Sequence, residues 1–91
     1  MELLFKGEKI GSIIHTKNEH CWEYGIFKGN ENFKKYKKFF ESIVCEETFD
    51  EINYDCELIN DDNWEVKKNG AIRGIYIPAI YIDGDIEFRY R

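Results

Sequence analysis

The last third of the chain decides the fold class, and residues 64–90 read WEVKKNGAIRGIYIPAIYIDGDIEFRY. Polar and apolar side chains alternate over residues 64–68, and the Asn69-Gly70 pair that follows is typical of a two-residue β-hairpin turn. The isoleucines further along also alternate, but their phase changes at Pro78, which predicts a bulge because proline cannot donate to a strand ladder. The stretch therefore predicts an antiparallel meander.

The last turn of this meander, at Asp83-Gly84-Asp85, admits two registers. A three-residue loop pairs Ile82 with Ile86 and Ile80 with Phe88, which gives one apolar face and one charged face. A two-residue loop would set both isoleucines against carboxylates. We therefore expect the three-residue loop.

The N-terminal segment predicts a second antiparallel unit. Two apolar runs, 3–5 and 10–14, flank Gly7-Glu8, and glycine in the first loop position favours a type II′ turn. This register places Phe5 opposite Ile10. A polar loop over 16–20 and a third strand over 22–28 are expected to follow.

Two helical patterns come next, and neither glycine nor proline separates them. The first has Asn32 as its N-cap, and its apolar residues recur at helical spacing; they are Phe33, Tyr36, Phe40, Ile43 and Val44. The second begins with a capping box over 48–51. Its buried stripe would comprise Phe49, Ile52, Cys56 and Ile59. One long kinked helix is the alternative.

Strands, then helices, then strands predict a single α+β domain over residues 1–91. We expect an antiparallel β-sheet, made of the N-terminal hairpin and the C-terminal meander, with two consecutive helices packed on one face.

The charge distribution is the strongest functional signal. Between Phe39 and Val66 the chain has no Lys or Arg, whereas ten of its 18 acidic residues lie there. Such an asymmetry steers association with a partner of opposite charge. We expect a small non-enzymatic binding protein that engages a basic protein partner through an acidic helix face, by analogy with immunity proteins and inhibitors. The residues predicted to contact the partner are Glu46, Glu47, Asp50, Tyr54, Glu57, Asp61 and Asp62. The alternative is a solvated face that only aids solubility.

Composition excludes several other classes. The net charge of −5 argues against direct binding of nucleic acid, because such proteins are normally basic. The longest apolar stretch, 71–82, is interrupted by Arg73 and is too short to span a membrane. Three cysteines match no motif spacing and no secretory signal is present, so we expect reduced thiols in the cytoplasm.

Catalytic and metal-binding patterns are weak. His15, His20 and Cys21 lie close in the sequence, but their spacing matches no zinc motif, and we expect no cofactor. A small-ligand-binding or catalytic site near His15, His20 and Trp22 is one alternative to protein binding. An oligomeric accessory subunit is another, and it would use an open strand edge or a sheet face that carries Tyr76, Tyr81, Arg73 and Arg89.

Several segments, taken in order, resemble a known family. They are Trp22-x-x-Gly25-x-Phe27, Phe33-x-x-Tyr36, Phe39-Phe40 and Tyr81-Ile82-Asp83-Gly84-Asp85-x-x-x-Phe88-Arg89. This order is similar to that of a family of small uncharacterised bacterial proteins with an Asp-Phe-Pro-Trp-x-x-Gly-x-Phe segment. The present chain has Glu19-His20-Cys21-Trp22 where the family has Asp-Phe-Pro-Trp. The family has no established activity, so the resemblance implies a shared α+β fold and no function.

Overall fold

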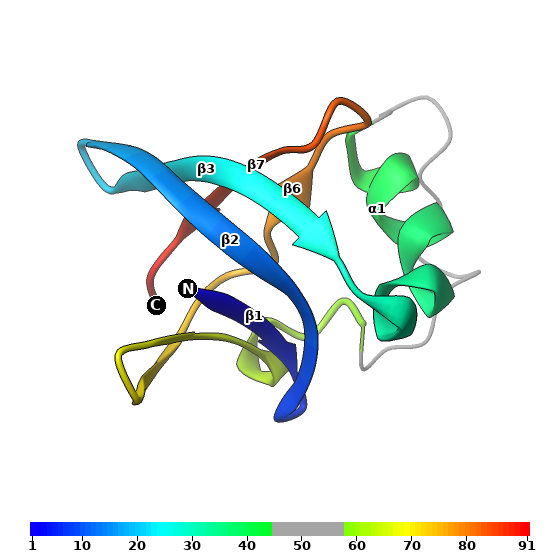
Figure 1. The fold of residues 1–91 in the computed structure, drawn as a ribbon, viewed down its shortest axis with the longest axis horizontal. Helices are drawn as coiled ribbons and strands as arrows, with labels where there is room; N and C mark the ends of the chain where they lie inside the picture. Colours follow the sequence, from blue (N-terminus) through cyan, green and yellow to red (C-terminus); the bar gives the residue numbers. More distant parts are fainter. Residues whose placement is uncertain (45–57) are drawn as a thin grey trace.

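Strands dominate the computed structural model, which describes residues 1–44 and 58–91 (Figure 1). They form one seven-stranded sheet in the order β5-β4-β1-β2-β3-β7-β6, and every neighbouring pair is antiparallel. The strands are β1 (Glu2–Phe5), β2 (Glu8–Glu19), β3 (Trp22–Gly29), β4 (Trp64–Lys68), β5 (Ala71–Gly74), β6 (Ala79–Ile80) and β7 (Asp85–Arg89).

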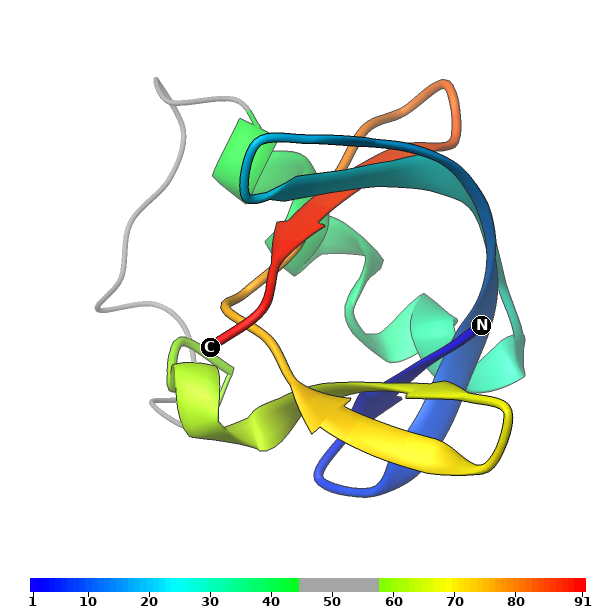
Figure 2. The same cartoon turned by 90° about the vertical axis from the view of Figure 1, so that its left-hand side faces the viewer.

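The two ends of this sheet meet. Strands β5 and β6 are consecutive parts of one segment, and between them Ile75 forms a bridge to Tyr90, just beyond β7. The amide of Tyr76 donates to the Arg89 carbonyl at 2.9 Å, and the amide of Arg91 donates to the Gly74 carbonyl at 3.1 Å. The sheet therefore curls round on itself, and Figure 2 shows the resulting ring of strands.

Two tight hairpin turns join neighbouring strands, each with two residues in the left-handed region. Lys6 and Gly7 have φ of 51° and 83°, and Asn69 and Gly70 have φ of 53° and 84°. This is the backbone of a type I′ turn, whose twist matches that of the flanking strands. The Asn69-Gly70 hairpin is confirmed.

Between β2 and β3 the ring of Phe27 packs closely against the backbone of Gly11. Gly11 lies two residues before Ile13, whose partner is Phe27. A Cβ on Gly11 would lie 2.3 Å from Cζ of Phe27, a distance that no side chain tolerates. Glycine is required here because the Phe27 ring occupies the space where a side chain would be.

The helical segment after β3 covers one end of the curled sheet (Figure 1). A 3₁₀ turn, η1 (Glu31–Lys35), is capped by Asn30, whose side-chain oxygen accepts from the amides of Asn32 at 2.9 Å and Phe33 at 3.3 Å. Helix α1 (Lys37–Val44) follows. Within the two described ranges, no helix is long and apolar enough to cross a membrane.

The core is aromatic and centres on Trp64, the first residue of β4. Its side chain is fully buried, with ring centroids 4.7 Å from Phe5 and 5.3 Å from Phe40. The indole Nε1 donates to the Leu58 carbonyl at 2.9 Å, so the one polar atom of the ring is satisfied. Phe39 and Phe40 of α1 are both buried, and they close the core at this end of the sheet.

The expected α+β arrangement, with two consecutive helices packed on one face, is wrong. The described residues form one curled sheet with a single eight-residue α-helix and two 3₁₀ turns, η1 and η3 (Asp61–Asn63). The segment expected to be a helix capped by Asn32 begins instead with a 3₁₀ turn capped by Asn30. Either asparagine could cap a helical turn, because each offers a side-chain oxygen to free backbone amides. The capping box over 48–51 and most of the second expected helix lie outside the described residues.

Two expected registers are also wrong. Phe5 lies opposite Glu8, not Ile10, because the turn comprises Lys6 and Gly7. At the last hairpin Ile80 pairs with Ile86. The expected polar loop over 16–20 is largely strand, since β2 continues to Glu19, whereas the third strand over 22–28 is confirmed.

One backbone bond to β3 and one within the hairpin set the register of the last turn. The Gly84 carbonyl accepts from the Phe27 amide at 2.7 Å, and the Tyr81 amide donates to the Asp85 carbonyl at 2.8 Å. Tyr81 and Asp85 therefore enclose a three-residue loop, Ile82-Asp83-Gly84, which has the expected length but lies one residue earlier than expected. Ile82 therefore has no strand partner, and 88 % of its surface is exposed. In place of the bulge expected at Pro78 the strand is interrupted, since β5 ends at Gly74 and β6 begins at Ala79.

Candidate functional site

Aromatic side chains gather on the outer face of β3 and β7. Side chains alternate between the two faces of a strand, so the buried Phe27 on the inner face places Ile26, Tyr24 and Trp22 outside. Across the ladder Trp22 pairs with Arg89 and Tyr24 pairs with Glu87. Directly opposite residues share a face, so both charged side chains also lie outside.

Arg89 lies between two exposed rings. Its guanidinium carbon is 5.2 Å from the ring centroid of Trp22 and 4.8 Å from that of Tyr76. Trp22 is 38 % exposed and Tyr76 is 40 % exposed. Cation–π contacts of this kind hold the three side chains together at a partly solvated surface.

Tyr81 extends this surface on the other side of Glu87. Its hydroxyl donates to Oε1 of Glu87 in a short hydrogen bond. That bond, together with burial and the charge of Glu87, raises the pKa of Tyr81 to about 12. Lys17 lies 5.1 Å from the ring centroid of Tyr24, and a shallow pocket of about 450 Å³ lies among these four side chains. We call Trp22, Tyr24, Tyr76, Tyr81, Glu87 and Arg89 together the aromatic face.

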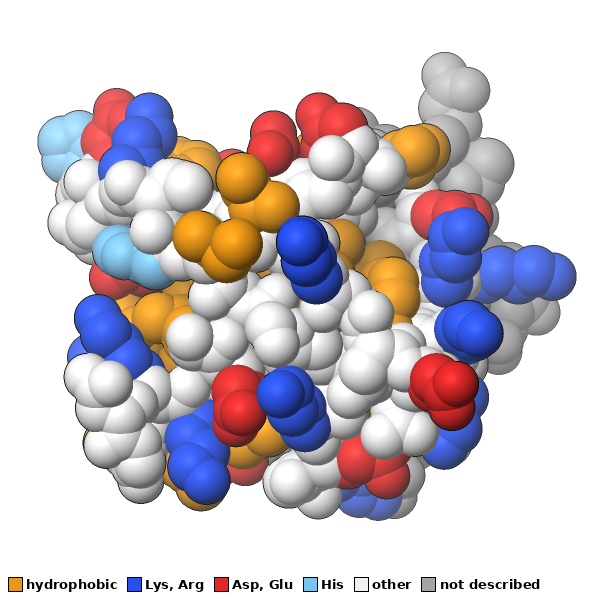
Figure 3. Space-filling model, viewed as in Figure 1, with side chains coloured by type: hydrophobic (Ala, Val, Ile, Leu, Met, Phe, Trp, Pro, Cys, Tyr) orange, Lys and Arg blue, Asp and Glu red, His pale blue; other side chains and the backbone are white. Residues whose placement is uncertain are grey.

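An apolar pair adjoins the aromatic face along β3. Ile14 of β2 is the direct partner of Ile26, and the two are 56 % and 43 % exposed. Figure 3 shows hydrophobic side chains gathered over the middle of β2 and β3, with charged side chains around them. The outward-pointing residues of β3, which are Trp22, Tyr24 and Ile26, are thus all aromatic or apolar.

A second group of side chains lies on the inner face of the sheet, at the end opposite α1. His15 Nε2 donates to Oε2 of Glu23 at 2.8 Å. The guanidinium carbon of Arg73 lies 3.8 Å from the ring centroid of Tyr90. Burial raises the pKa of Tyr90, the Glu23 charge raises it further, and the Arg73 charge lowers it. Both charged groups are therefore close to Tyr90.

The backbone register places these residues on the inner face. Glu23 is opposite Phe88, Arg73 is opposite Val66, and both of these partners belong to the core. Opposite residues share a face, so Glu23 and Arg73 point inward although their ends reach solvent. Side chains alternate along β2, and Ile13 is buried, so the side chain of His15 also points inward. In the sequence, the alternation of side chains along each strand was the signal for this group. That signal identifies the group only when the pairing register of the strands is known.

The expected site near His15, His20 and Trp22 is not assembled. His15 lies on the inner face, His20 is in the β2–β3 turn with φ of 58°, and Trp22 lies on the outer face. Neither histidine has the neighbours of a metal ligand, since the described part of the chain contains no group of three or more His, Cys, Asp or Glu side chains arranged to hold a metal ion.

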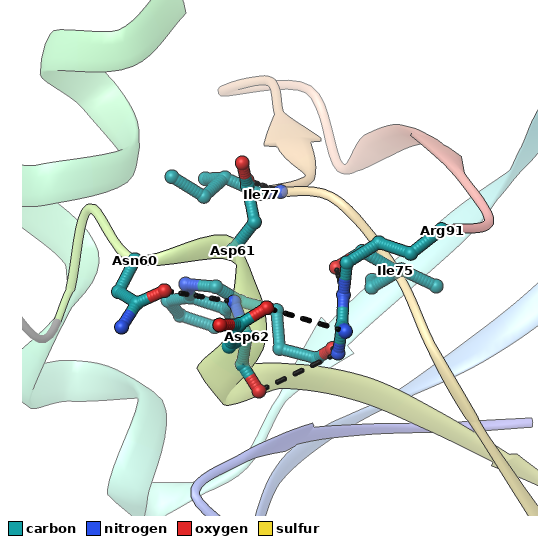
Figure 4. A network of polar contacts seen from close by, with 7 residues as sticks. Asn60, Asp61, Asp62, Ile75, Ile77 and Arg91 are labelled. Carbon is teal, nitrogen blue, oxygen red and sulfur yellow. Dashed lines mark hydrogen bonds and ion pairs between the residues drawn. The ribbon is translucent and has the colours of Figure 1, made fainter.

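The two predicted contact residues that the structure describes have partners within the fold. Asp61 Oδ1 accepts from the Ile77 amide at 2.8 Å, and Asp62 Oδ1 lies 3.5 Å from Nη1 of Arg91 (Figure 4). Arg91 also donates from Nε to the Ile75 carbonyl at 2.9 Å. The other five predicted contact residues, Glu46, Glu47, Asp50, Tyr54 and Glu57, lie outside the described residues.

The tyrosine and arginine residues expected to share a sheet face are divided between the two faces. Tyr76, Tyr81 and Arg89 belong to the aromatic face, whereas Arg73 contacts Tyr90 on the inner face. Trp22 joins the aromatic face because β3 and β7 are neighbours, a pairing between distant segments that local patterns do not show.

Comparisons of the chain with protein families, with curated proteins and with solved structures found no match. The resemblance to a family of uncharacterised bacterial proteins therefore stays a hypothesis, and the geometry of the two sites carries the functional argument.

Proposed function

We propose that this protein is a non-enzymatic binding domain that docks a basic protein partner on its aromatic face. The observation that carries the proposal is the exposed stack of Trp22, Arg89 and Tyr76. Tryptophan, tyrosine and arginine are the residues that most often dominate the energy of protein interfaces. Contact with Arg89 orders both rings before binding, which lowers the entropy cost of association.

Charge supports a basic partner over an acidic one. The pocket beside Tyr81 is lined by the carboxylates of Asp83, Asp85 and Glu87, with Lys17 as the one basic side chain in its lining. The whole chain carries −5. A partner with a positive surface would be attracted to this side of the sheet, whereas the phosphates of a nucleic acid would be repelled.

The acidic segment between Phe39 and Val66 contributes to the same attraction in this proposal. Within it, Glu46, Glu47, Asp50, Tyr54 and Glu57 remain predicted contacts. Asp61 and Asp62 are weaker candidates, because both have partners within the fold. A cytoplasmic location is part of the proposal, and the exposed free thiol of Cys21 is compatible with a reducing compartment.

The test is affinity capture from a lysate of the source organism with four forms of the protein, at about 50 and 300 mM salt. The forms are the wild type, W22A/Y76A, E46Q/E47Q/D50N/E57Q and the control I72A, whose exposed side chain lies on β5, away from the aromatic face. A basic protein should be retained by the wild type and the control, and lost from W22A/Y76A at both salt concentrations.

The acidic variant separates the two surfaces. Reduced capture by that variant at low salt would show that the acidic segment adds long-range attraction, as proposed. Equal capture by W22A/Y76A and the wild type would contradict the proposal, because the aromatic face would then be dispensable.

A further inference from the structure

Figure 2 looks toward the end of the curled sheet that lies opposite α1. Here the hairpin β4–β5 and the last residues of the chain surround a cavity of about 450 Å³. Its lining includes Glu23, Lys68, Arg73 and Tyr90, with Val66 at its base. We call this cavity the mouth. Its size is within the range of small-molecule sites.

One side of the mouth is cationic. The Arg73 guanidinium is stacked on Tyr90, and Lys68 lies beside the turn of the same hairpin. Neither side chain forms an ion pair with a carboxylate of residues 1–44 or 58–91. Stacking on an aromatic ring leaves the in-plane N–H groups of arginine directed outward, where they can donate to a carboxylate.

The other side is anionic. The Glu23 side chain is only 13 % exposed, and its Oε2 accepts from His15 at 2.8 Å. This bond fixes the orientation of the carboxylate, while Oε1 has no hydrogen-bond partner among the residues that the structure describes. Glu23 and Arg73 shift the pKa of Tyr90 in opposite directions, so they act on the same ring.

We propose that the mouth binds a small zwitterion, an amino acid or a related amino-carboxylate, whose carboxylate meets Arg73 and Lys68 and whose ammonium group meets Glu23. A simple anion fits less well because the poorly solvated Glu23 repels it, and a simple cation is repelled by Arg73 and Lys68. The lining also includes Asn69 and the short apolar side chains of Val66 and Ala71, which leave room for the ligand's carbon chain. This site is separate from the aromatic face, which lies on the outer surface.

The experiment is a titration of the isotopically labelled protein followed by NMR. The probes are each of the L-α-amino acids, β-alanine and 4-aminobutyrate, with acetate and methylammonium as ligands that carry only one of the two charges. At least one amino-carboxylate should shift the amide signals of Glu23, Arg73 and Tyr90 at about 20 mM or below, with a Kd at least about 10-fold lower than that of acetate or methylammonium.

Matched variants test the assigned roles. R73Q and E23Q should each raise the Kd by about 10-fold or more. K68Q changes an exposed side chain and is expected to fold normally, and it should raise the Kd about 3-fold. The control is K67Q, because Lys67 precedes Lys68 on β4 and points to the opposite face. It should leave the Kd unchanged.

Three results would overturn the proposal. Binding of acetate as tight as that of any amino-carboxylate would make the mouth a plain anion site. Absence of shifts with every probe would leave no site of this chemistry. Shifts confined to Trp22 and Tyr76 would place binding on the aromatic face instead.

Discussion

The guanidinium of Arg91 donates to the carbonyl oxygen of Ile75 at 2.9 Å, across the seam where the two ends of the sheet meet. The same side chain donates from Nη2 to the Trp64 carbonyl at 3.2 Å. It therefore ties the segment after β7 to β4 and to the segment after β5. The closure of the sheet depends on this side chain as well as on the backbone bridge between Ile75 and Tyr90.

Replacing Arg91 by alanine is expected to lower the free energy of unfolding by about 1.5–3 kcal/mol, because the carbonyl groups of Ile75, Trp64 and Asp62 lose a charged donor. The measurement is urea denaturation followed by tryptophan fluorescence. D62N is the control, since the Asp62 side chain is 81 % exposed and its ion pair is worth little. If D62N costs as much as R91A, the ion pair and not the carbonyl bonds would be the source of the stability.

The two tryptophans should differ sharply in their contribution to stability. W64A removes a fully buried ring together with its bond to the Leu58 carbonyl, and should cost about 3–5 kcal/mol or prevent folding. W22A removes a partly exposed ring and should change stability by less than about 1 kcal/mol. W64F keeps most of the packing and makes the comparison measurable if W64A does not fold. Similar losses for W22A and W64F would contradict this assignment of core and surface.

A methyl group at Gly11 should be destabilising, because it would lie 2.3 Å from Cζ of Phe27. We expect G11A to cost about 1–3 kcal/mol, the usual effect of overpacking. The double variant G11A/F27L should be more stable than the sum of the two single effects, since a smaller side chain at 27 removes the clash with the ring and leaves the contact with the Lys28 carbonyl oxygen at 2.7 Å. Chemical denaturation of the four forms gives the coupling energy, and additive effects would show that the ring and the glycine do not interact.

Local patterns predicted the parts of the fold that local chemistry determines. Asn69-Gly70 adopts two positive φ angles readily, so the β4–β5 hairpin was predictable from those two residues. Lys6 adopts φ of 51° without being a residue that favours it, and the first hairpin was therefore placed one turn position too late. The closure between Ile75 and Tyr90 joins two segments that are distant in the sequence, and the polar–apolar pattern within each segment does not predict it.

The register expected for the last hairpin was wrong because it was chosen to pair apolar side chains. It favoured a partner for Ile82, but the bond from the Phe27 amide to the Gly84 carbonyl holds the loop against β3 and leaves Ile82 exposed. The mouth was missed for a related reason. His15 and Glu23 follow the inward parity of Ile13 and Phe27, yet their contact becomes visible only once β2 and β3 are paired.

The hydrogen bond between Tyr81 and Glu87 gives a prediction at high pH. The pKa of Tyr81 is raised from 10.0 to about 12, first by this bond, then by burial and by the charge of Glu87. Since the folded state favours the neutral phenol, the stabilisation is fully present below pH 10 and is lost as the pH rises through about 12.

Tyrosinate absorbance of the wild type minus that of Y81F isolates this titration. E87Q should move the isolated pKa down toward 10, because the bond to a carboxylate and the repulsion by its charge both disappear. Thermal unfolding between pH 10 and about 12 should show a larger loss of stability for the wild type than for Y81F. An unchanged pKa in E87Q would mean that burial, and not Glu87, keeps the phenol protonated.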